Sequence, residues 1–190
     1  LGMEGFTRSA DETVQEANAL YRPYTESGGD GNPVAMVFRD VVISEKVGFT
    51  YSGMPGEEAA ADFMARIHAI RDQLIAEDAE GPHLVTVILD GENAWEHYEN
   101  DGKAFLQTLY TELAGDQSIK TVTPSEYLEL FPAEPSREIE ELWPGSWISH
   151  DFSTWIGEEE ENRAWDYLRR TREAFGMYEK GVYEPPDAQA

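Results

Sequence analysis

The chain alternates between short apolar runs and longer stretches in which apolar residues recur at helical spacing. The nearly continuous apolar run at 84–89 is typical of a strand covered on both faces, as in parallel sheets. A short apolar run at 34–38 and the segment 119–122 are predicted to be two further strands. Helical spacing extends over 57–77 and 101–114, between these runs. Strands separated by helices in this order predict a parallel sheet with right-handed crossovers. The expected fold class is therefore α/β, with parallel strands alternating with helices.

Three further helices are predicted outside this alternation. Ser9, followed by Glu12, has the spacing of a capping box and predicts a helix over 10–20. A proline leads into a short helix over 126–130, because proline is well tolerated in the first helical turn. An amphipathic pattern predicts a last helix over 159–175.

The whole pattern predicts one domain followed by a short tail. With 190 residues, 41% of them hydrophobic, the chain is long enough to bury a core. We expect a single α/β domain over 1–180 and a flexible, proline-containing tail over 181–190. Within the domain, Ser44 is expected to cap a helical turn over 41–49.

The charge of the chain limits its partners. Thirty-eight acidic against 14 basic residues give a formal net charge of -24. Nucleic acid and anionic membrane surfaces would be repelled, so neither is an expected partner. The sequence contains no run of about 18 apolar residues and no charged-then-apolar leader, so we expect a cytoplasmic protein.

The acidic excess has two interpretations. In a high-salt habitat, screening would relieve the self-repulsion of the carboxylates, since the Debye length falls to about 3 Å at 1 M salt. The alternative is an acidic protein of an ordinary habitat. A salt titration of folding distinguishes them, because maximal stability in dilute buffer contradicts the halophilic interpretation.

The strongest candidate site follows the run at 84–89. Asp90 comes directly after it, Gly91 allows a sharp turn, and Glu92 and Trp95 follow. In parallel sheets, ligands bind at the carboxyl ends of the strands. Two carboxylates beside an indole suit a sugar site, since glycosidases use one carboxyl as acid and another as nucleophile or base. The alternative is an ordinary turn, for which Asp-Gly-Glu is equally suited.

Charge also follows the first apolar run. Arg39 and Asp40 come directly after 34–38 and fit two interpretations. They are either a polar pair on the active rim of the sheet, which binds substrate, or a surface ion pair that contributes little.

Metal binding is a weaker interpretation of the same region. The chain has no cysteine, so thiolate ligands are excluded. Neither the HExxH nor the EF-hand spacing is present. Oxygen and imidazole ligands could still come from Asp90, Glu92, Glu96, His97 and His150. We expect neither a metal nor a cofactor.

Three of the five tryptophans lie within 142–157, a stretch without regular periodicity. Such tryptophans either seal a core beneath a long loop or form platforms on which sugar rings stack. Both interpretations remain open at this stage.

An ordered series of motifs resembles glycoside hydrolase family 57. The series comprises the segments 37–40, 48–49, 87–98, 100–110, 121–127, 145–148, 155–157 and 161–165. The resemblance covers most of residues 34–170. It implies the C-terminal part of an incomplete (β/α)7 barrel and a retaining enzyme that acts on α-glucans.

The resemblance also assigns roles to residues. It implies that Asp90 is the general acid/base, that Glu92 and Trp95 line the site beside it, and that Trp147 faces the sugar. The family's nucleophile is a glutamate on an earlier strand, preceded by a His-rich motif, and neither is found in this chain. After the Asp-Gly-Glu, Asn93 and Ala94 stand where better-characterised members have Phe-Gly.

Two functions follow from this reasoning. The first is a portion of a retaining glycoside hydrolase or transglycosylase, inactive alone, whose nucleophile is supplied from outside this chain by the preceding part of the same parent protein. Its partner would be an α-glucan or oligosaccharide. The second is a non-catalytic carbohydrate-binding or structural module derived from such a barrel.

Overall fold

The chain divides into two compact units, Met3–Glu141 and Leu142–Ala190, the latter together with Leu1–Gly2. The division falls inside the region 1–180 that the sequence predicts to be one domain. The structure is a computed structural model that describes residues 17–27, 32–91, 95–134, 137–139, 145–146, 148–149 and 151–182. The two units are described separately.

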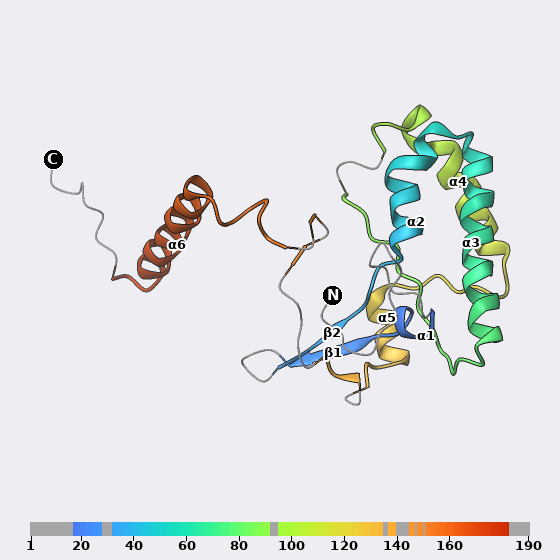
Figure 1. Ribbon diagram of the computed structural model, residues 1–190, viewed down its shortest axis with the longest axis horizontal. Coiled ribbons are helices and arrows are strands. Elements are labelled where there is room, and N and C mark those ends of the chain that lie inside the picture. The colour runs from blue at the N-terminus through green and yellow to red at the C-terminus, as the bar shows by residue number, and fades with distance from the viewer. Residues whose placement is uncertain are drawn as a thin grey trace. The chain divides into compact units, whose positions relative to one another are not determined.

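Two helices dominate the first unit. α3 (Gly56–Ala76) and α4 (Lys103–Gly115) lie side by side (Figure 1), and they confirm the helices predicted over 57–77 and 101–114. α4 ends at a glycine, as its sequence predicts. α5 (Pro124–Leu130) begins with a capping box in which Thr123 and Glu126 bond each other's backbone. Three predicted helices thus follow local sequence signals.

Shorter elements complete this unit. α1 (Ala17–Leu20) is the described end of the helix predicted over 10–20. α2 (Val41–Glu45) continues into a π-helical turn, η1 (Lys46–Thr50), and a 3-10 turn, η2 (Tyr51–Gly53). A further 3-10 turn, η3 (Glu99–Gly102), precedes α4. Asp40, and not Ser44 as predicted, caps α2, because its side chain accepts a hydrogen bond from the Ile43 N–H.

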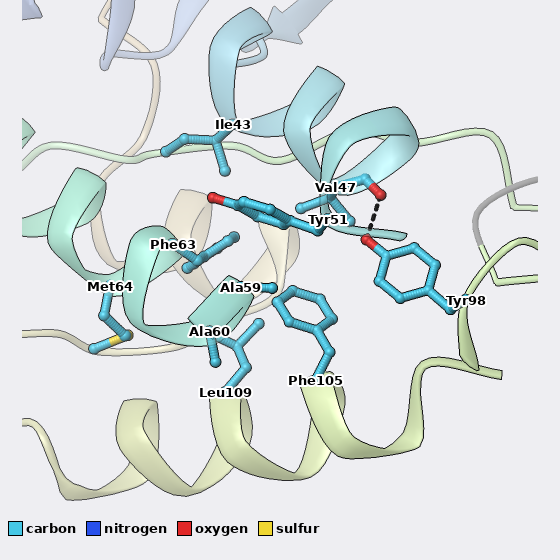
Figure 2. Close-up of a cluster of buried hydrophobic side chains, with 10 residues drawn as sticks. All are labelled: Ile43, Val47, Tyr51, Ala59, Ala60, Phe63, Met64, Tyr98, Phe105 and Leu109. Atoms are coloured by element: carbon cyan, nitrogen blue, oxygen red, sulfur yellow. Dashed lines mark hydrogen bonds between the residues drawn. The ribbon is translucent and has the colours of Figure 1, made fainter. Parts of the chain in front are cut away.

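The core fills the space between α2, α3 and α4 (Figure 2). It consists of buried, mostly apolar side chains contributed by these helices and the turns beside them: Ile43, Val47, Tyr51, Ala59, Ala60, Phe63, Met64, Tyr98, Phe105 and Leu109. Small residues near the start of α3 allow α4 to approach closely. A Cβ atom added to Gly56 would lie 2.5 Å from the Phe105 backbone nitrogen. The helix pair therefore depends on glycine at this position.

The sheet differs from the predicted one. β2 (Pro33–Met36) confirms a strand near 34–38, but its partner is β1 (Tyr24–Ser27), which pairs with it antiparallel as a hairpin. The structure shows no parallel sheet among the described residues. Of the predicted parallel pairing, the described residues show one isolated parallel bridge, between Arg39 and Thr86. A second parallel bridge joins Thr25 and Glu138, which lie in none of the predicted strands.

The 84–89 segment is extended, and one of its faces is partly open near the end of the segment. Val85, Val87 and Leu89 pack against the α3–α4 core, whereas Ile88 on the other face is 43% exposed. The prediction of a strand buried on both faces was therefore wrong. The apolar pattern of 84–89 is nearly continuous, yet one side of the segment faces the core and the other is partly open. The spacing of apolar residues alone does not reveal this difference.

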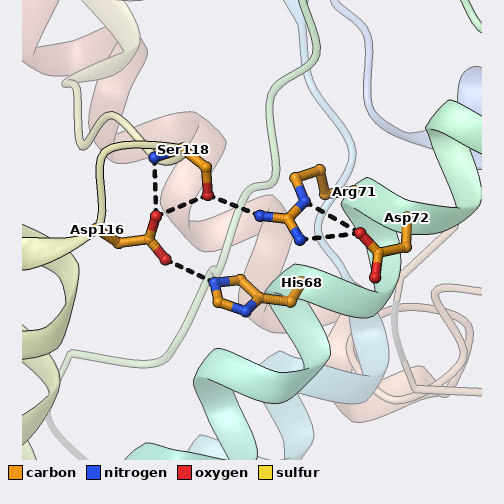
Figure 3. A network of polar contacts seen from close by, with 5 residues as sticks. All are labelled: His68, Arg71, Asp72, Asp116 and Ser118. Carbon is orange, nitrogen blue, oxygen red and sulfur yellow. Dashed lines mark hydrogen bonds and ion pairs between the residues drawn. The ribbon is translucent and has the colours of Figure 1, made fainter.

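The 119–122 segment is not a strand either. The residues just before it bind α3 (Figure 3), and the residue just after it, Thr123, caps α5. His68 Nε2 lies 2.6 Å from Asp116 Oδ2, and the Asp116 Oδ1 accepts hydrogen bonds from the backbone N–H and hydroxyl of Ser118. Arg71 donates to the Ser118 hydroxyl at 2.8 Å. These contacts tie the start of the segment to α3, and the α5 cap holds its end.

The second unit contains α6 (Glu159–Glu179), which confirms and extends the helix predicted over 159–175. Glu158 and Glu161 form its capping box. The Trp165 indole N–H donates to the Trp155 carbonyl at 2.7 Å. The tail at 183–190 lies outside the described residues. Across the described part of the chain, no helix is long and apolar enough to cross a membrane.

A buried tyrosine and a carboxylate give the first unit a predictable acid sensitivity. Tyr51 is fully buried and donates to Asp62 at 2.7 Å, and Arg66 and Lys46 pair with the same carboxylate. The hydrogen bonds from Arg66 and Tyr51 lower the Asp62 pKa from 3.8 to about 2. Because the folded pKa is depressed, this stabilisation is present above about pH 4 and is lost as the pH falls toward 2.

Asp62→Asn should therefore lower the thermal midpoint at pH 7 and weaken the fall of that midpoint between pH 4 and 2. Circular dichroism melts across this pH range measure both effects. Asp72→Asn is the matched control, since the Asp72 side chain is 67% exposed and pairs with the neighbouring Arg71. An equal pH slope for Asp62→Asn and the wild type would contradict the assignment.

Candidate functional site

Asp90 lies exposed at the end of an extended segment that is fixed against α2. The Asp40 N–H donates to the Thr86 carbonyl at 2.8 Å, and the Ile88 N–H donates to the Ser44 hydroxyl oxygen at 3.2 Å. Ser44 itself is buried, with 2% of its surface exposed, and the contact is half-buried. Two hydrogen bonds within four residues of Asp90 therefore fix the backbone of the segment that leads to this carboxylate.

Asp40 is engaged inside the fold. It is 6% exposed, its Oδ1 accepts from the Ile43 N–H at 2.7 Å, and its Oδ2 accepts from the Tyr21 hydroxyl at 2.5 Å. Burial and this hydrogen bond raise the pKa of Tyr21. Asp40 is therefore a helix cap and not a surface ion pair. Its predicted contact with substrate stays a prediction.

The parallel bridge sets the position of Arg39 relative to Asp90. Arg39 lies opposite Thr86, four residues before Asp90. In an extended chain that offset corresponds to about 13 Å. The structure therefore does not bring the backbones of the two predicted site residues together at one rim, and the substrate contact of Arg39 also stays a prediction.

An aromatic group anchors the loop after Asp90. The half-buried Trp95 ring lies 5.3 Å from Tyr98 and 6.4 Å from Phe105, centroid to centroid. Gly102, with φ 71°, allows this packing, because a Cβ there would lie 3.0 Å from the Trp95 ring. The indole therefore has a core-facing side. Glu92 and Trp147 lie outside the described residues.

Tyr98 ties the same loop to η1 (Figure 2). Its hydroxyl donates to the Val47 carbonyl at 2.5 Å, and burial raises its pKa to about 12. The sequence did not single out Tyr98 or the Ser44 contact, since no local signal shows that a side chain reaches a backbone group some fifty residues away. These two residues position the candidate site without belonging to its chemistry.

Tyr98→Phe should lower the free energy of unfolding by about 1 kcal/mol, because the Val47 carbonyl loses its hydrogen-bond donor. Urea unfolding followed by circular dichroism measures the change. Tyr110→Phe is the matched control, since the Tyr110 side chain is 63% exposed on α4. Equal stability of the two variants would show that the Tyr98 hydroxyl does not anchor the loop.

The metal alternative finds little support in the described part of the chain. There, no group of three or more His, Asp or Glu residues could hold a metal ion. Glu96 and His97, which are neighbours in sequence and exposed, form a pair at 3.5 Å. Glu92 and His150, the other candidate ligands, lie outside the described residues.

Comparison with known families agrees with the motifs and with the structural division. The family model described as Glycosyl hydrolase family 57 matches residues 2–140 and so ends where the first structural unit ends. This match covers most of the chain, which therefore belongs to glycosyl hydrolase family 57. Its function is of the glycoside hydrolase or transglycosylase kind. No curated protein matches the sequence.

The family match includes some of the predicted site residues and not others. Asp90, Glu92 and Trp95 lie within it, as do Arg39 and Asp40. Trp147 and the motifs at 155–157 and 161–165 lie beyond its end, in the second unit.

Proposed function

We propose that this chain supplies the general acid/base, Asp90, of a retaining glycoside hydrolase or transglycosylase that acts on α-glucans. The observation that carries the proposal is the position of Asp90, exposed at the end of a segment held by backbone contacts at Thr86 and Ile88. Family membership supports the reaction class. An exposed carboxylate on a rigid support can meet a polymeric substrate without rearrangement of the fold.

The chemistry assigns two roles to Asp90. As an acid, it protonates the leaving glycosidic oxygen while a second carboxylate attacks the anomeric carbon. As a base, it then takes a proton from the water or sugar hydroxyl that releases the glycosyl-enzyme intermediate. The nucleophile has to lie about 5–5.5 Å away. No motif of this chain matches the family's nucleophile, so in our proposal it comes from outside the chain.

The remaining predicted residues have supporting roles in this proposal. Glu92 and Trp95 would line the site beside Asp90, and Trp147, Arg39 and Asp40 would be further contacts with sugar. The parallel bridge of Arg39 with Thr86 supports the interpretation of 84–89 as a barrel strand next to the segment that follows β2. This is the pairing that a partial (β/α)7 barrel requires.

Maltoheptaose should change the tryptophan fluorescence of the purified chain, because Trp95 is partly exposed and, in our proposal, lines the site beside Asp90. Trp95→Phe should remove most of that change. Trp165→Phe is the matched control, since the Trp165 indole N–H bonds the Trp155 carbonyl in the second unit. A response that survives Trp95→Phe would place sugar binding elsewhere, and an equal response to a β-linked glucan would contradict the α-glucan assignment.

A further inference from the structure

An apolar groove lies along the 84–89 segment, on the side of α3. Its volume is about 550 Å³, within the range of ordinary ligand sites. Ile67, Ile70 and Leu74 of α3 form its floor, and the segments around Val85 and Ile119 form its two walls. Among the described residues, Asp90 and the residues proposed to bind sugar beside it, Trp95, Arg39 and Asp40, do not line this groove.

One wall of the groove has an open backbone edge. Residues 84, 86 and 88 direct their backbone groups to one side, where they bond Tyr21, Asp40 and Ser44. In an extended chain the intervening residues direct theirs to the opposite side. Within the described residues, the N–H and C=O groups of Val85 and Val87 have no hydrogen-bond partner. A half-buried edge of this kind favours pairing with another strand.

The chain's own opposite wall is held away from this edge. The contacts of Asp116 with His68 and of Ser118 with Arg71 fix the start of the 119–122 segment to α3 (Figure 3). The Thr123 cap fixes its end. The two walls therefore leave a space between them, with apolar side chains beneath.

The charge of the groove is opposite to that of the chain. The charged side chains that line it are Arg71, which is paired with Asp72, and Lys120, together with the ionisable His83. Among the described residues no carboxylate lines it. Burial and the charges of Arg22 and Arg137 lower the pKa of His83. In a chain of net charge -24, the exposed Lys120 at this lining favours an occupant that carries negative charge.

We propose that the groove binds an extended peptide segment of a partner protein as an added strand. The peptide would pair its backbone with Val85 and Val87 and place apolar residues against α3. Its acidic residues would lie near Lys120. Backbone pairing supplies affinity in this mode of recognition, whereas side-chain pockets and charge supply specificity.

Amide hydrogen exchange of the full chain, followed by NMR, tests the proposal. The probe is an acetylated and amidated hexapeptide of alternating glutamate and valine. At saturating peptide, exchange of the Val85 and Val87 amides should slow by about tenfold or more, as for newly formed ladder hydrogen bonds. The same peptide with lysine in place of glutamate should bind more weakly.

Lys120→Glu should weaken binding of the acidic peptide by about threefold to tenfold, the range expected when an exposed charge pair is reversed. Lys103→Glu is the matched control, because Lys103 makes the same charge change at an exposed position outside the groove. Slow exchange of Val85 and Val87 in the free chain would overturn the proposal, as would unchanged exchange with either peptide. Equal binding of the two peptides would overturn its charge selectivity.

Discussion

Asp90→Asn is expected to lower kcat on an α-glucan by about 10²–10⁴-fold in the enzyme that combines this chain with its nucleophile. This is the usual contribution of a positioned acid/base. An amide cannot donate the proton that the leaving oxygen needs, nor accept one from water. The fold should be unaffected, because Asp90 is exposed and asparagine has nearly the same shape. Steady-state kinetics with maltoheptaose measures the loss.

The leaving group separates loss of acid catalysis from loss of binding. A maltosyl fluoride needs little protonation, so its first step should survive in Asp90→Asn, and the intermediate should accumulate as a burst. Glu99→Gln is the matched control, since Glu99 is an exposed carboxylate in the same region. Unchanged turnover of maltoheptaose by Asp90→Asn would remove Asp90 from the mechanism and would favour the non-catalytic module.

Gly56→Ala is expected to lower the free energy of unfolding by about 1–3 kcal/mol, the usual cost of overpacking a core. The new Cβ would lie 2.5 Å from the Phe105 nitrogen and 2.8 Å from the carbonyl carbon and the Cβ of Ala104. Two of these three atoms are backbone, so α3 and α4 would have to separate. Phe105 is 1% exposed, and the separation would therefore loosen the centre of the core. Urea unfolding measures the change.

Gly53→Ala provides the matched control for this stability prediction. It adds the same methyl group at a position where nothing lies within 4 Å of the new Cβ. Its effect should stay within about 0.5 kcal/mol, as for most surface substitutions. Equal stability of the two alanine variants would show that the close approach of α4 to Gly56 does not limit packing.

The helices were predictable because their signals are local. α3 carries apolar residues at helical spacing and α4 ends at Gly115, so their bounds differ from the expected ones by one or two residues. The start of α5 follows from a proline beside a capping pair. None of these signals requires knowledge of a distant partner.

The sheet was not predictable to the same degree because strand pairing is not local. The sequence Tyr24–Ser27 lacks an apolar run, yet it forms β1 by pairing with β2. The 119–122 segment was predicted to be a strand, yet contacts of Asp116 and Ser118 tie its start to α3, and it pairs with no strand among the described residues. A buried strand pattern shows that a segment is apolar and does not show which segment lies beside it.

For the candidate site, too, local features could be predicted from the sequence and long-range contacts could not. Asp90 could be predicted because an apolar run ends there and a motif surrounds it. The attachments that position it, the Ser44 hydroxyl and the Tyr98 hydroxyl, each contact backbone more than forty residues away in sequence. Only the fold reveals such contacts. The register that separates Arg39 from Asp90 is likewise a property of the fold.

The most direct test of the central claim is the release of reducing ends from maltoheptaose by the purified 190-residue chain. The claim is that this chain holds the acid/base and that the nucleophile lies elsewhere. We expect sugar binding without turnover above the uncatalysed rate, because an acid/base alone cannot complete a double displacement. Turnover by this chain that disappears in Asp90→Asn would contradict the claim and would place the nucleophile within its own residues.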